Sequence, residues 1–434
     1  MLDAGTVFWV MFITLVILIA LRVPISFALA FSVVPILILT PQVTPIMLLH
    51  RMMMQYGSFI LLAIPFFVLA ANLMNWSGIT NMLLRLAQAM VGHLPGGLGH
   101  VNVVTSMIFA GISGSSNADA AGEGSIIIPA MIKAGYDVNF TVAVTACSAV
   151  MGVIIPPSII MVVWGGVMNV SVSGLFLAGI VPGILIGFFQ MGLCYCYAVK
   201  RHYPRASQFS LAGLGRAVKE SILAIFTPVI IVGGVVFGIV TPTEAALIAV
   251  LYAMVLGFFV YRTLTLKSFA TVLYDTMLLS SIVLFCVGCA AIYAWVLAFY
   301  KIPQYVVKIL SAMTTDPTVM LLLMVVVFLI VGCFIDAVPA IIILAPLLKP
   351  LTESVGIHPL HFAIVGCITL AYGLITPPYG LCLLITCQIA GINVIQPLRE
   401  VGAFLAAMLV VLLLAVFFPN VSLGIPKLLM PSIF

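Results

Sequence analysis

The sequence predicts an all-α polytopic membrane protein built from two inverted repeats. Hydrophobic residues make up 64% of its 434 positions and charged residues only 6%, whereas soluble proteins carry about 25% charged residues. The apolar runs are continuous and do not alternate with polar positions, so they favour helices over a barrel. A polar motif followed by a double proline occurs once in each half of the chain, which predicts the duplication.

The apolar runs leave room for roughly ten to twelve spans, since a spanning helix needs about 20 residues. Basic residues gather in the segment 200–219, which the positive-inside rule places in the cytoplasm. Counting spans back to Arg22 places the N-terminus on the outer, periplasmic side. The net charge of +5 therefore reflects topology, and we expect no nucleic-acid partner. The stretches 47–54 and 80–99 are more amphipathic, and each could lie along the membrane surface.

The repeated motif divides the chain into two halves that we expect to share one plan. Each half should contain scaffold helices, a re-entrant helical hairpin and a helix broken at the double proline. The predicted segments are a first repeat at 1–199, with its hairpin at about 105–130 and its broken helix at about 140–166; a basic cytoplasmic linker at 200–221; and a second repeat at 222–434, with its hairpin at about 325–350 and its broken helix at about 362–390.

The double prolines Pro156-Pro157 and Pro377-Pro378 predict helix breaks that expose carbonyl oxygens. A proline has no N–H and clashes with the carbonyl four residues earlier. A carbonyl without a partner is costly inside a membrane, and a bound cation such as Na+ would satisfy it. The carbonyls concerned are those of Gly152, Val153, Gly373 and Leu374.

The first polar motif, GISGSSNADAAGEGSIIIP at 111–129, has the small residues and side-chain oxygens that a tight turn inside the membrane requires. The N–H groups that such a turn exposes favour an anion. Asp119 and Asp336 each precede a proline by ten positions, and we align the two motifs on them. Intramembrane acids are functional by default, although either aspartate could cap a helix. Glu123 either faces a polar cavity or binds the glycine-rich backbone.

Several long motifs resemble one known family. They are SGSSNADAAGEGSIIIPAMIKAGY (113–136), VIIPPSIIMVVWGGVMNVSVSGLFLAGIVPG (153–183), TPTEAA (241–246) and GLITPPYGLCLL (373–384). Together they resemble the large membrane subunit of tripartite ATP-independent periplasmic (TRAP) transporters, and the resemblance covers essentially the whole chain. One departure is Asn117, where many members of the family have alanine.

The resemblance implies a fold of the ion-transporter superfamily, with a scaffold and a transport domain that moves as an elevator. It implies no enzymatic activity but Na+-driven uptake of an organic anion, a carboxylate such as a C4-dicarboxylate or sialic acid, across the bacterial inner membrane. A small four-helix membrane subunit would be a separate chain in the lipid bilayer, and a periplasmic substrate-binding protein would deliver the ligand.

The resemblance also implies particular site residues. The first Na+ site would use Ser115, Asn117, Asp119, Gly152, Ile155 and Pro157. The second would use Gly332, Asp336, Gly373, Thr376 and Tyr379. The substrate would lie near Ser113, Ser116 and Thr376.

Two other functions compete with this one. A carrier of the same superfamily could take up carboxylates with Na+ but without a binding protein. An intramembrane enzyme would need a catalytic pair, for which Asp119 and Asp336 are the candidates, but it would leave the duplicated hairpins and double prolines without a role. Nothing in the chain resembles the filter or the charged ring of a channel.

Overall fold

The computed structural model describes residues 3–40, 42–311 and 314–434, and every regular element in these ranges is helical. Seven of the described helices are long and apolar enough to cross a membrane, and eight shorter apolar helices accompany them. The predicted all-α polytopic architecture is confirmed.

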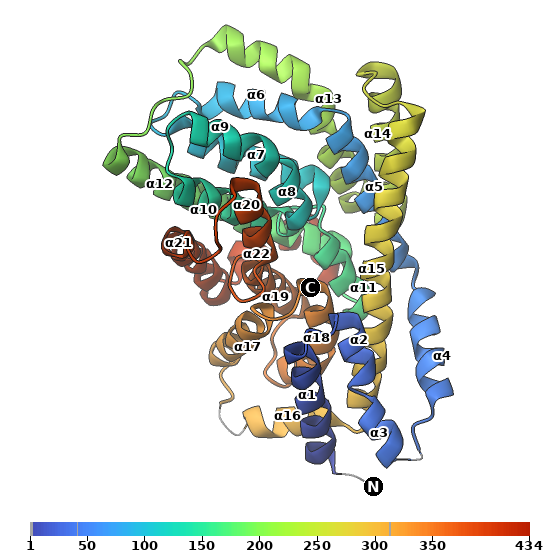
Figure 1. Cartoon of the computed structure of the whole chain (residues 1–434). Coiled ribbons are helices and arrows are strands. Elements are labelled where there is room, and N and C mark those ends of the chain that lie inside the picture. The colour runs from blue at the N-terminus through green and yellow to red at the C-terminus, as the bar shows by residue number, and fades with distance from the viewer. Residues whose placement is uncertain (1–2, 41, 312–313) are drawn as a thin grey trace.

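The helix α15 (Leu266–Phe299) is the longest of the described elements and runs along one side of the molecule (Figure 1). Both α4 and α5 pack against it, and Arg51 of α4 lies over the Trp295 ring at 5.5 Å. The N-terminal helices are α1 (Ala4–Ala20), α2 (Ile25–Phe31), α3 (Val34–Leu39), α4 (Pro45–Tyr56), α5 (Ala63–Trp76) and α6 (Ile79–Val91), and the central ones are α13 (Leu211–Val236) and α14 (Pro242–Val255).

The two halves follow the same order of helix, tight turn, helix, broken helix and long helix. In the first half the elements are α7 (Gly97–Ser113), α8 (Ser116–Gly122), α9 (Gly124–Lys133), α10 (Val138–Ala149), the 3-10 turn η2 (Val150–Val153), α11 (Ile159–Met168) and α12 (Val172–Arg201). In the second half they are α17 (Pro317–Gly332), α18 (Ala337–Ser354), α19 (Pro359–Gly373), α20 (Leu381–Ala390) and α21 (Leu398–Phe417), flanked by α16 (Ile302–Ser311) and α22 (Asn420–Leu429). Both double prolines lie in the breaks, and both have cis peptide bonds.

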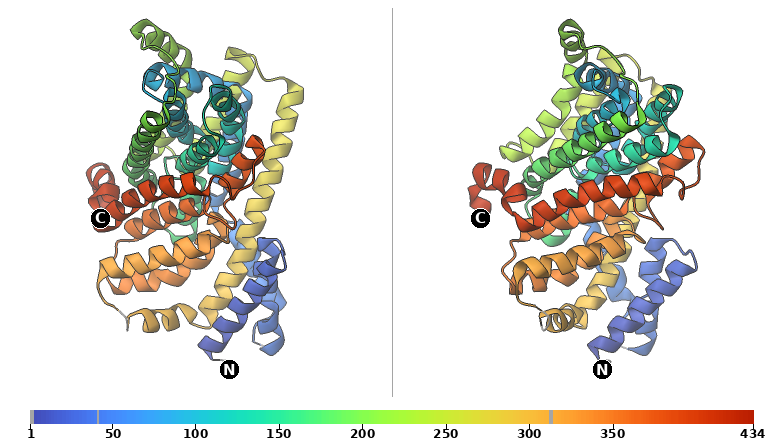
Figure 2. Two further views of the ribbon diagram at one scale, coloured as in Figure 1. Left: turned by 60° about the vertical axis from the view of Figure 1, so that its left-hand side comes forward. Right: turned by 90° about the vertical axis from the view of Figure 1, so that its left-hand side faces the viewer.

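The second-half elements lie in the middle of the molecule. In all three ribbon views, α17 to α21 lie between α6–α12 on one side and α1–α3 with α16 on the other (Figures 1 and 2). Helix α20 packs against both α8 and α10, and α18 packs against α11 and α15. The hairpin and the broken helix of each half therefore contact those of the other half.

The basic linker is shorter than predicted. Helix α12 continues to Arg201 and α13 begins at Leu211, so within the predicted linker 200–221 only 202–210 is non-helical. The reason is the N-cap of α13, where Ser210 Oγ accepts a hydrogen bond from Gly213 N at 3.2 Å.

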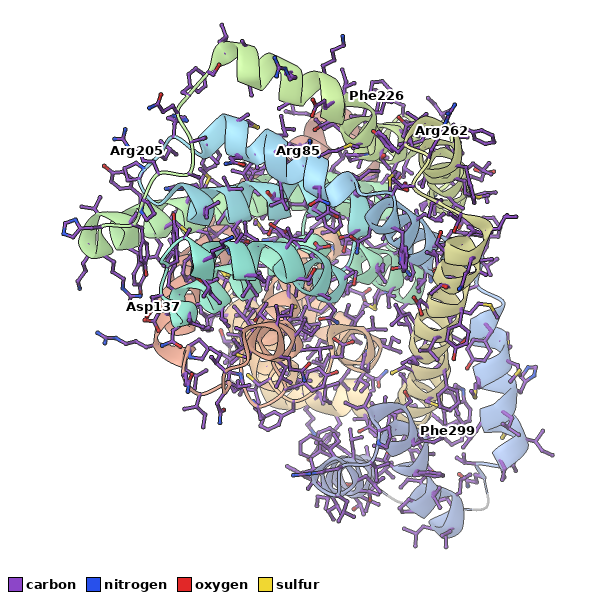
Figure 3. All side chains as sticks on the ribbon, turned by 45° about the horizontal axis from the view of Figure 1, so that its top comes forward. Arg85, Asp137, Arg205, Phe226, Arg262 and Phe299 are labelled. Atoms are coloured by element: carbon purple, nitrogen blue, oxygen red, sulfur yellow. The ribbon has the colours of Figure 1, made fainter. Side chains whose placement is uncertain are left out.

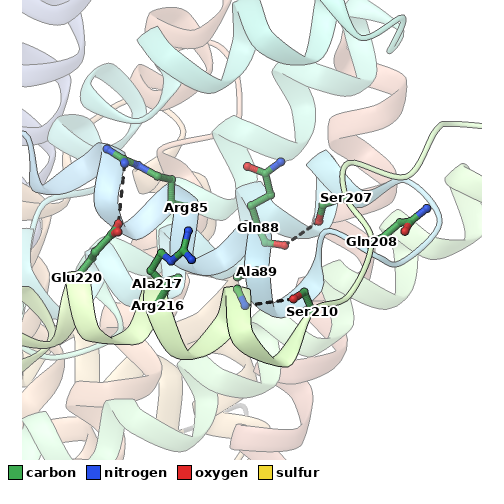
Figure 4. Close-up of a pocket in the computed structure, with 10 residues that line it drawn as sticks. Arg85, Gln88, Ala89, Ser207, Gln208, Ser210, Arg216, Ala217 and Glu220 are labelled. Atoms are coloured by element: carbon green, nitrogen blue, oxygen red, sulfur yellow. Dashed lines mark hydrogen bonds and ion pairs between the residues drawn. The ribbon is translucent and has the colours of Figure 1, made fainter.

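The linker is bonded to the end of α6. Ala206 N and Ser207 N both donate to Gly92 O, at 2.9 and 3.1 Å. In Figure 3 the labelled Arg85 marks α6 and the labelled Arg205 marks the linker. Figure 4 shows the open pocket of about 420 Å³ that α6, the linker and α13 enclose. The linker is thus fixed to the end of α6 by backbone hydrogen bonds, and it keeps α6 beside α13.

Arg201 connects three helices at the end of α12. Its guanidinium lies 2.8 Å from Glu400 Oε1 on α21 and 3.3 Å from Asp137 Oδ1 at the start of α10. It also stacks over the Tyr197 ring at 4.9 Å. The Glu400 side chain is only 8% exposed, so its charge depends on this partner.

We predict that Arg201→Ala destabilises the protein by about 1–3 kcal/mol, because it leaves a buried carboxylate without its partner. The midpoint of thermal unfolding in detergent should fall. Lys200→Ala is the matched control, since Lys200 is exposed and forms no ion pair with another described residue. An equal midpoint for the two variants would contradict the prediction.

Gly332 and Gly373 bring the backbones of α17 and α19 together. A Cβ atom on Gly373 would lie 2.5 Å from Gly332 O and 2.8 Å from Gly332 Cα. No side chain fits there without displacing backbone. The pair therefore sets how closely the second hairpin approaches its broken helix.

We predict that Gly373→Ala costs about 1–3 kcal/mol of stability, as overpacking of a close contact does. Gly402→Ala on α21 is the control, because a Cβ there would meet nothing within 4 Å. Thermal unfolding of both variants in detergent tests this. A Gly373→Ala protein as stable as Gly402→Ala would show that the helices can separate without cost.

Candidate functional site

The tip of the first hairpin is the turn at Gly114 and Ser115 between α7 and α8. Gly114 has a φ of +65°, and a Cβ there would lie 2.9 Å from Pro157 O, so the position requires glycine. Gly114 O accepts a hydrogen bond from Ile159 N at 3.2 Å. Ser115 caps α8 by accepting from Ala118 N at 3.5 Å. The tip is thus bonded directly to the break in the neighbouring helix.

The first broken helix has its own hydroxyl partners. Ser158 Oγ donates to Val153 O at 2.7 Å, and Ser116 Oγ donates to Val150 O at 3.1 Å. The prediction that the Val153 carbonyl has no hydrogen-bond partner is therefore wrong, because the Ser158 hydroxyl occupies one of the two lone pairs of that oxygen. Ile155 packs its side chain against Gly183 of α12.

Asp119 is the most unusual group of this region. The residue is 0% exposed, and neither carboxylate oxygen has a hydrogen-bond partner among the described residues. A Cβ on Gly152 would collide with Asp119 Oδ2 and lie 3.1 Å from Ser116 N, so the carboxylate rests against the backbone of the broken helix. A buried charge without a partner is very costly, and carboxylate oxygens are chemically suited to hold a cation.

The second hairpin repeats the bond between tip and break. Tyr379 N, just after the second double proline, donates to Cys333 O at 2.9 Å in the turn between α17 and α18. Asp336 caps α18, and its Oδ1 accepts from Ala337 N at 2.9 Å. One Asp336 oxygen therefore has a backbone donor, in contrast to Asp119.

The carbonyls that the second double proline should expose also have donors. Thr376 N donates to Gly373 O at 3.1 Å, and Cys382 N donates to Leu374 O at 2.9 Å. The prediction that these carbonyls are left unsatisfied is wrong, because the chain folds back within the break. Each oxygen keeps a second lone pair for a cation.

The two aspartates do not occupy equivalent places, so the alignment of the motifs on Asp119 and Asp336 is wrong. Asp336 is the N-cap of α18, whereas Ser115 is the N-cap of α8 and Asp119 lies one turn inside that helix. The sequence left two roles open for each aspartate, a functional one and helix capping. Asp336 has the capping role. The structural counterpart of Asp336 in the first half is Ser115.

Asn117 links the halves. Cys382 Sγ of α20 donates to Asn117 Oδ1 of α8 at 3.3 Å. The tip of the first hairpin is therefore in contact with the helix that follows the second break.

Glu123 takes neither of the two roles considered for it. The residue is 1% exposed. Its carboxylate accepts from Ser106 Oγ at 2.8 Å, and Ser106 also bonds Ser148 of α10 at 2.8 Å. This network holds the hairpin against α10. Its members are Asn102, Ser106, Glu123, Thr145 and Ser148.

A cavity of about 750 Å³ lies between the first hairpin tip, α5, α15 and α20. Of the three residues predicted near the substrate, Ser113 lines it. Ser116 instead bonds Val150 O, and Thr376 bonds Tyr372 O at 2.8 Å and lies outside the lining. The polar lining residues are Asn72, Asn75, Ser113, Ser115, Asn117 and Asp275.

Three of these polar lining residues were missed by sequence reasoning. Asn72 and Asn75 are the polar positions of the otherwise apolar stretch 60–76. Two amides in an apolar span could have indicated a polar cavity beside it. Asp275 lies in a long apolar run and carries no motif that singles it out in the sequence. The helix α15 in fact begins at Leu266, so Asp275 is an acid within a spanning helix and merits attention by default.

Comparison with solved structures supports the fold. Among solved structures, the Alcanivorax borkumensis YdaH transporter matches with a TM-score of 0.56 at 17% identity, covering 86% of this chain and 87% of that one. The fold is thus similar to that of a known transporter.

Sequence comparison gives the family. The sialic acid TRAP transporter large permease protein SiaM of Vibrio cholerae is 37% identical over 405 residues, which is 93% of this chain and 95% of that protein. The C4-dicarboxylate TRAP transporter large permease protein DctM of Pseudomonas aeruginosa is 36% identical and covers 85% of this chain and 86% of its own length. Residues 12–421 match the family model described as the DctM component of tripartite ATP-independent periplasmic transporters. The chain therefore belongs to the DctM component family of TRAP transporters and is a multipass transport protein of the bacterial inner membrane.

Proposed function

We propose that this chain is the large subunit of a Na+-coupled importer of an organic anion. A periplasmic substrate-binding protein delivers the anion, and a small four-helix membrane subunit completes the complex. Relatives named for sialic acid and for C4-dicarboxylates support a carboxylate as the cargo. The family name, tripartite and periplasmic, supports the two partners.

The observation that carries the proposal is the buried carboxylate of Asp119. It rests against the broken helix at Gly152 with both oxygens unpartnered. A cation bound here would neutralise a charge that no described side chain neutralises. Oxygens from Ser115, Asn117 and the backbone near Pro157 lie on the adjoining turn, so the donor set suits Na+.

A second Na+ site would lie at the second hairpin. Gly332 and Gly373 approach each other there, and Asp336, Thr376 and Tyr379 belong to the adjoining turn and break. Asp336 has one oxygen beyond its bond to Ala337 N. The carbonyl of Gly373 has a second lone pair, so a cation could be held without breaking any recorded hydrogen bond.

The cavity supports an elevator in which one part of the chain slides past another. Its walls come from α5 and α15 on one side and from α7, α8 and α20 on the other. In the proposed division, α1–α5 and α13–α15 are the scaffold. The two hairpins, the broken helices, α12 and α21 form the transport domain. Substrate bound between them would change sides when the transport domain moves.

Uptake into proteoliposomes tests the proposal. They would hold this chain with its small membrane partner, under an imposed Na+ gradient, with and without the binding protein loaded with a labelled carboxylate. Uptake that needs both Na+ and the binding protein is the expected result. Uptake indifferent to the binding protein would favour a stand-alone carboxylate carrier. Uptake indifferent to Na+ would remove the coupling proposed at Asp119.

We predict that Asp336→Ala raises the Na+ concentration for half-maximal uptake by roughly tenfold or more, since even outer-shell partners of a metal typically contribute 10–100-fold to its affinity. Thr376→Ala should act in the same direction but more mildly. Glu353→Gln is the control, because this carboxylate is exposed and pairs only with Lys349 at 3.9 Å. The same Na+ dependence in Asp336→Ala and Glu353→Gln would rule out Asp336 as a ligand.

A further inference from the structure

The cavity proposed for an anionic substrate contains an acid and no base. Asp275 of α15 lines it, and none of its lining residues, all of them in the described part of the chain, is lysine or arginine. A carboxylate in the wall repels a second carboxylate on a ligand and attracts hydroxyl, amide or ammonium donors. The position of Asp275 therefore bears on which organic anion the cavity takes.

Asp275 is available to a ligand. It forms no ion pair and no recorded hydrogen bond with another described residue, although the neighbouring Thr276 accepts from Asn72 Nδ2 at 3.0 Å. That bond uses the donor end of the Asn72 amide and leaves its oxygen as an acceptor. The wall made by α5 and α15 thus offers the Asp275 carboxylate and the Asn72 oxygen as acceptors, and Asp275 is the charged one of the two. Asn75 on the same wall accepts from Thr80 Oγ1 at 2.9 Å, so it keeps its amide N–H groups as donors.

The opposite wall is the tip of the first hairpin. Ser113, Ser115 and Asn117 line the cavity there, beside the Na+ site proposed at Asp119. A substrate carboxylate is placed best at this wall, where serine hydroxyls can donate to it and the cation can screen it. The rest of the molecule then points toward α15.

We propose that Asp275 is a specificity-determining residue that selects a monocarboxylate with hydrogen-bond donors at the end remote from its carboxylate, such as a hydroxylated sugar acid, over a simple dicarboxylate. The inference rests on the function proposed above. A volume of about 750 Å³ suits a ligand of this size, since ligand pockets commonly span about 300–1,000 Å³. A site built to bind a hydroxyl rejects analogues without it strongly, because its acceptor is then left unpaired.

The test measures ligand binding to the permease itself, so that the selectivity of the binding protein does not enter. The purified complex of the large and small subunits would be titrated in Na+ with N-acetylneuraminate, D-gluconate or succinate, following its thermal unfolding. The wild-type complex should bind at least one of the two hydroxylated acids more tightly than succinate. Asp275→Asn should weaken binding of that acid by roughly tenfold or more, the size of a lost hydrogen bond to a charged group, and should strengthen binding of succinate.

Leu279→Ala is the matched control, because it changes the same wall without changing its charge and should shift all three ligands alike. Asp275→Thr serves as a second neutral variant should the asparagine protein be unstable. Tighter binding of succinate by the wild type, or an unchanged ratio of affinities in both neutral variants, would overturn the role of Asp275 while leaving Na+-coupled carboxylate transport intact. A wild-type complex that binds none of the three and takes up no carboxylate with Na+ would overturn both proposals.

Discussion

Both halves of this protein are organised by one backbone hydrogen bond, which joins the tip of a helical hairpin to the break in the neighbouring helix. Ile159 N donates to Gly114 O in the first half, and Tyr379 N donates to Cys333 O in the second. A break in an apolar environment leaves N–H groups that must find an acceptor. The hairpin turn has carbonyl groups that need a donor. The turn and the break therefore satisfy each other's backbone hydrogen-bonding groups. The hairpin and the broken helix consequently form one unit in each half.

This pairing explains why glycines and serines surround the breaks. Gly114 lets the tip approach Pro157 O, and Gly373 lets the second break approach Gly332. Ser158 donates to the carbonyl of Val153, whose helical donor Pro157 removes. Ser116 donates to the carbonyl of Val150 at the start of the same break. The apolar chain thus satisfies its broken backbone locally. Beside the first break, both carboxylate oxygens of Asp119 stay without a hydrogen-bond partner among the described residues, and this is the strongest reason to propose a cation there.

The sequence was sufficient for the helical architecture and for the positions of the two breaks, but not for the register of the two motifs. Continuous apolar runs and a duplicated double proline predict helices, hairpins and breaks, because proline chemistry acts locally. Alignment of Asp119 with Asp336 failed because spacing along the chain does not reveal which residue caps a helix. The donors of the Leu374 carbonyl and the cavity role of Asp275 were also out of reach. Both depend on contacts that form only when the break folds back or when α15 lies beside a hairpin distant in sequence.

Asn117 shows how such a distant contact can join the duplicated units. Its amide oxygen accepts from Cys382 of α20, so the first hairpin tip touches the helix after the second break. Alanine, which the resemblance gives as common at this position, has no oxygen to accept that bond. Asn117 also lines the cavity together with Leu381, the residue before Cys382. The cavity wall, the first proposed Na+ site and the junction of the halves therefore meet at one side chain. A cation or substrate that engaged Asn117 would act on both halves at once, which is the physical requirement for moving them as a single transport domain.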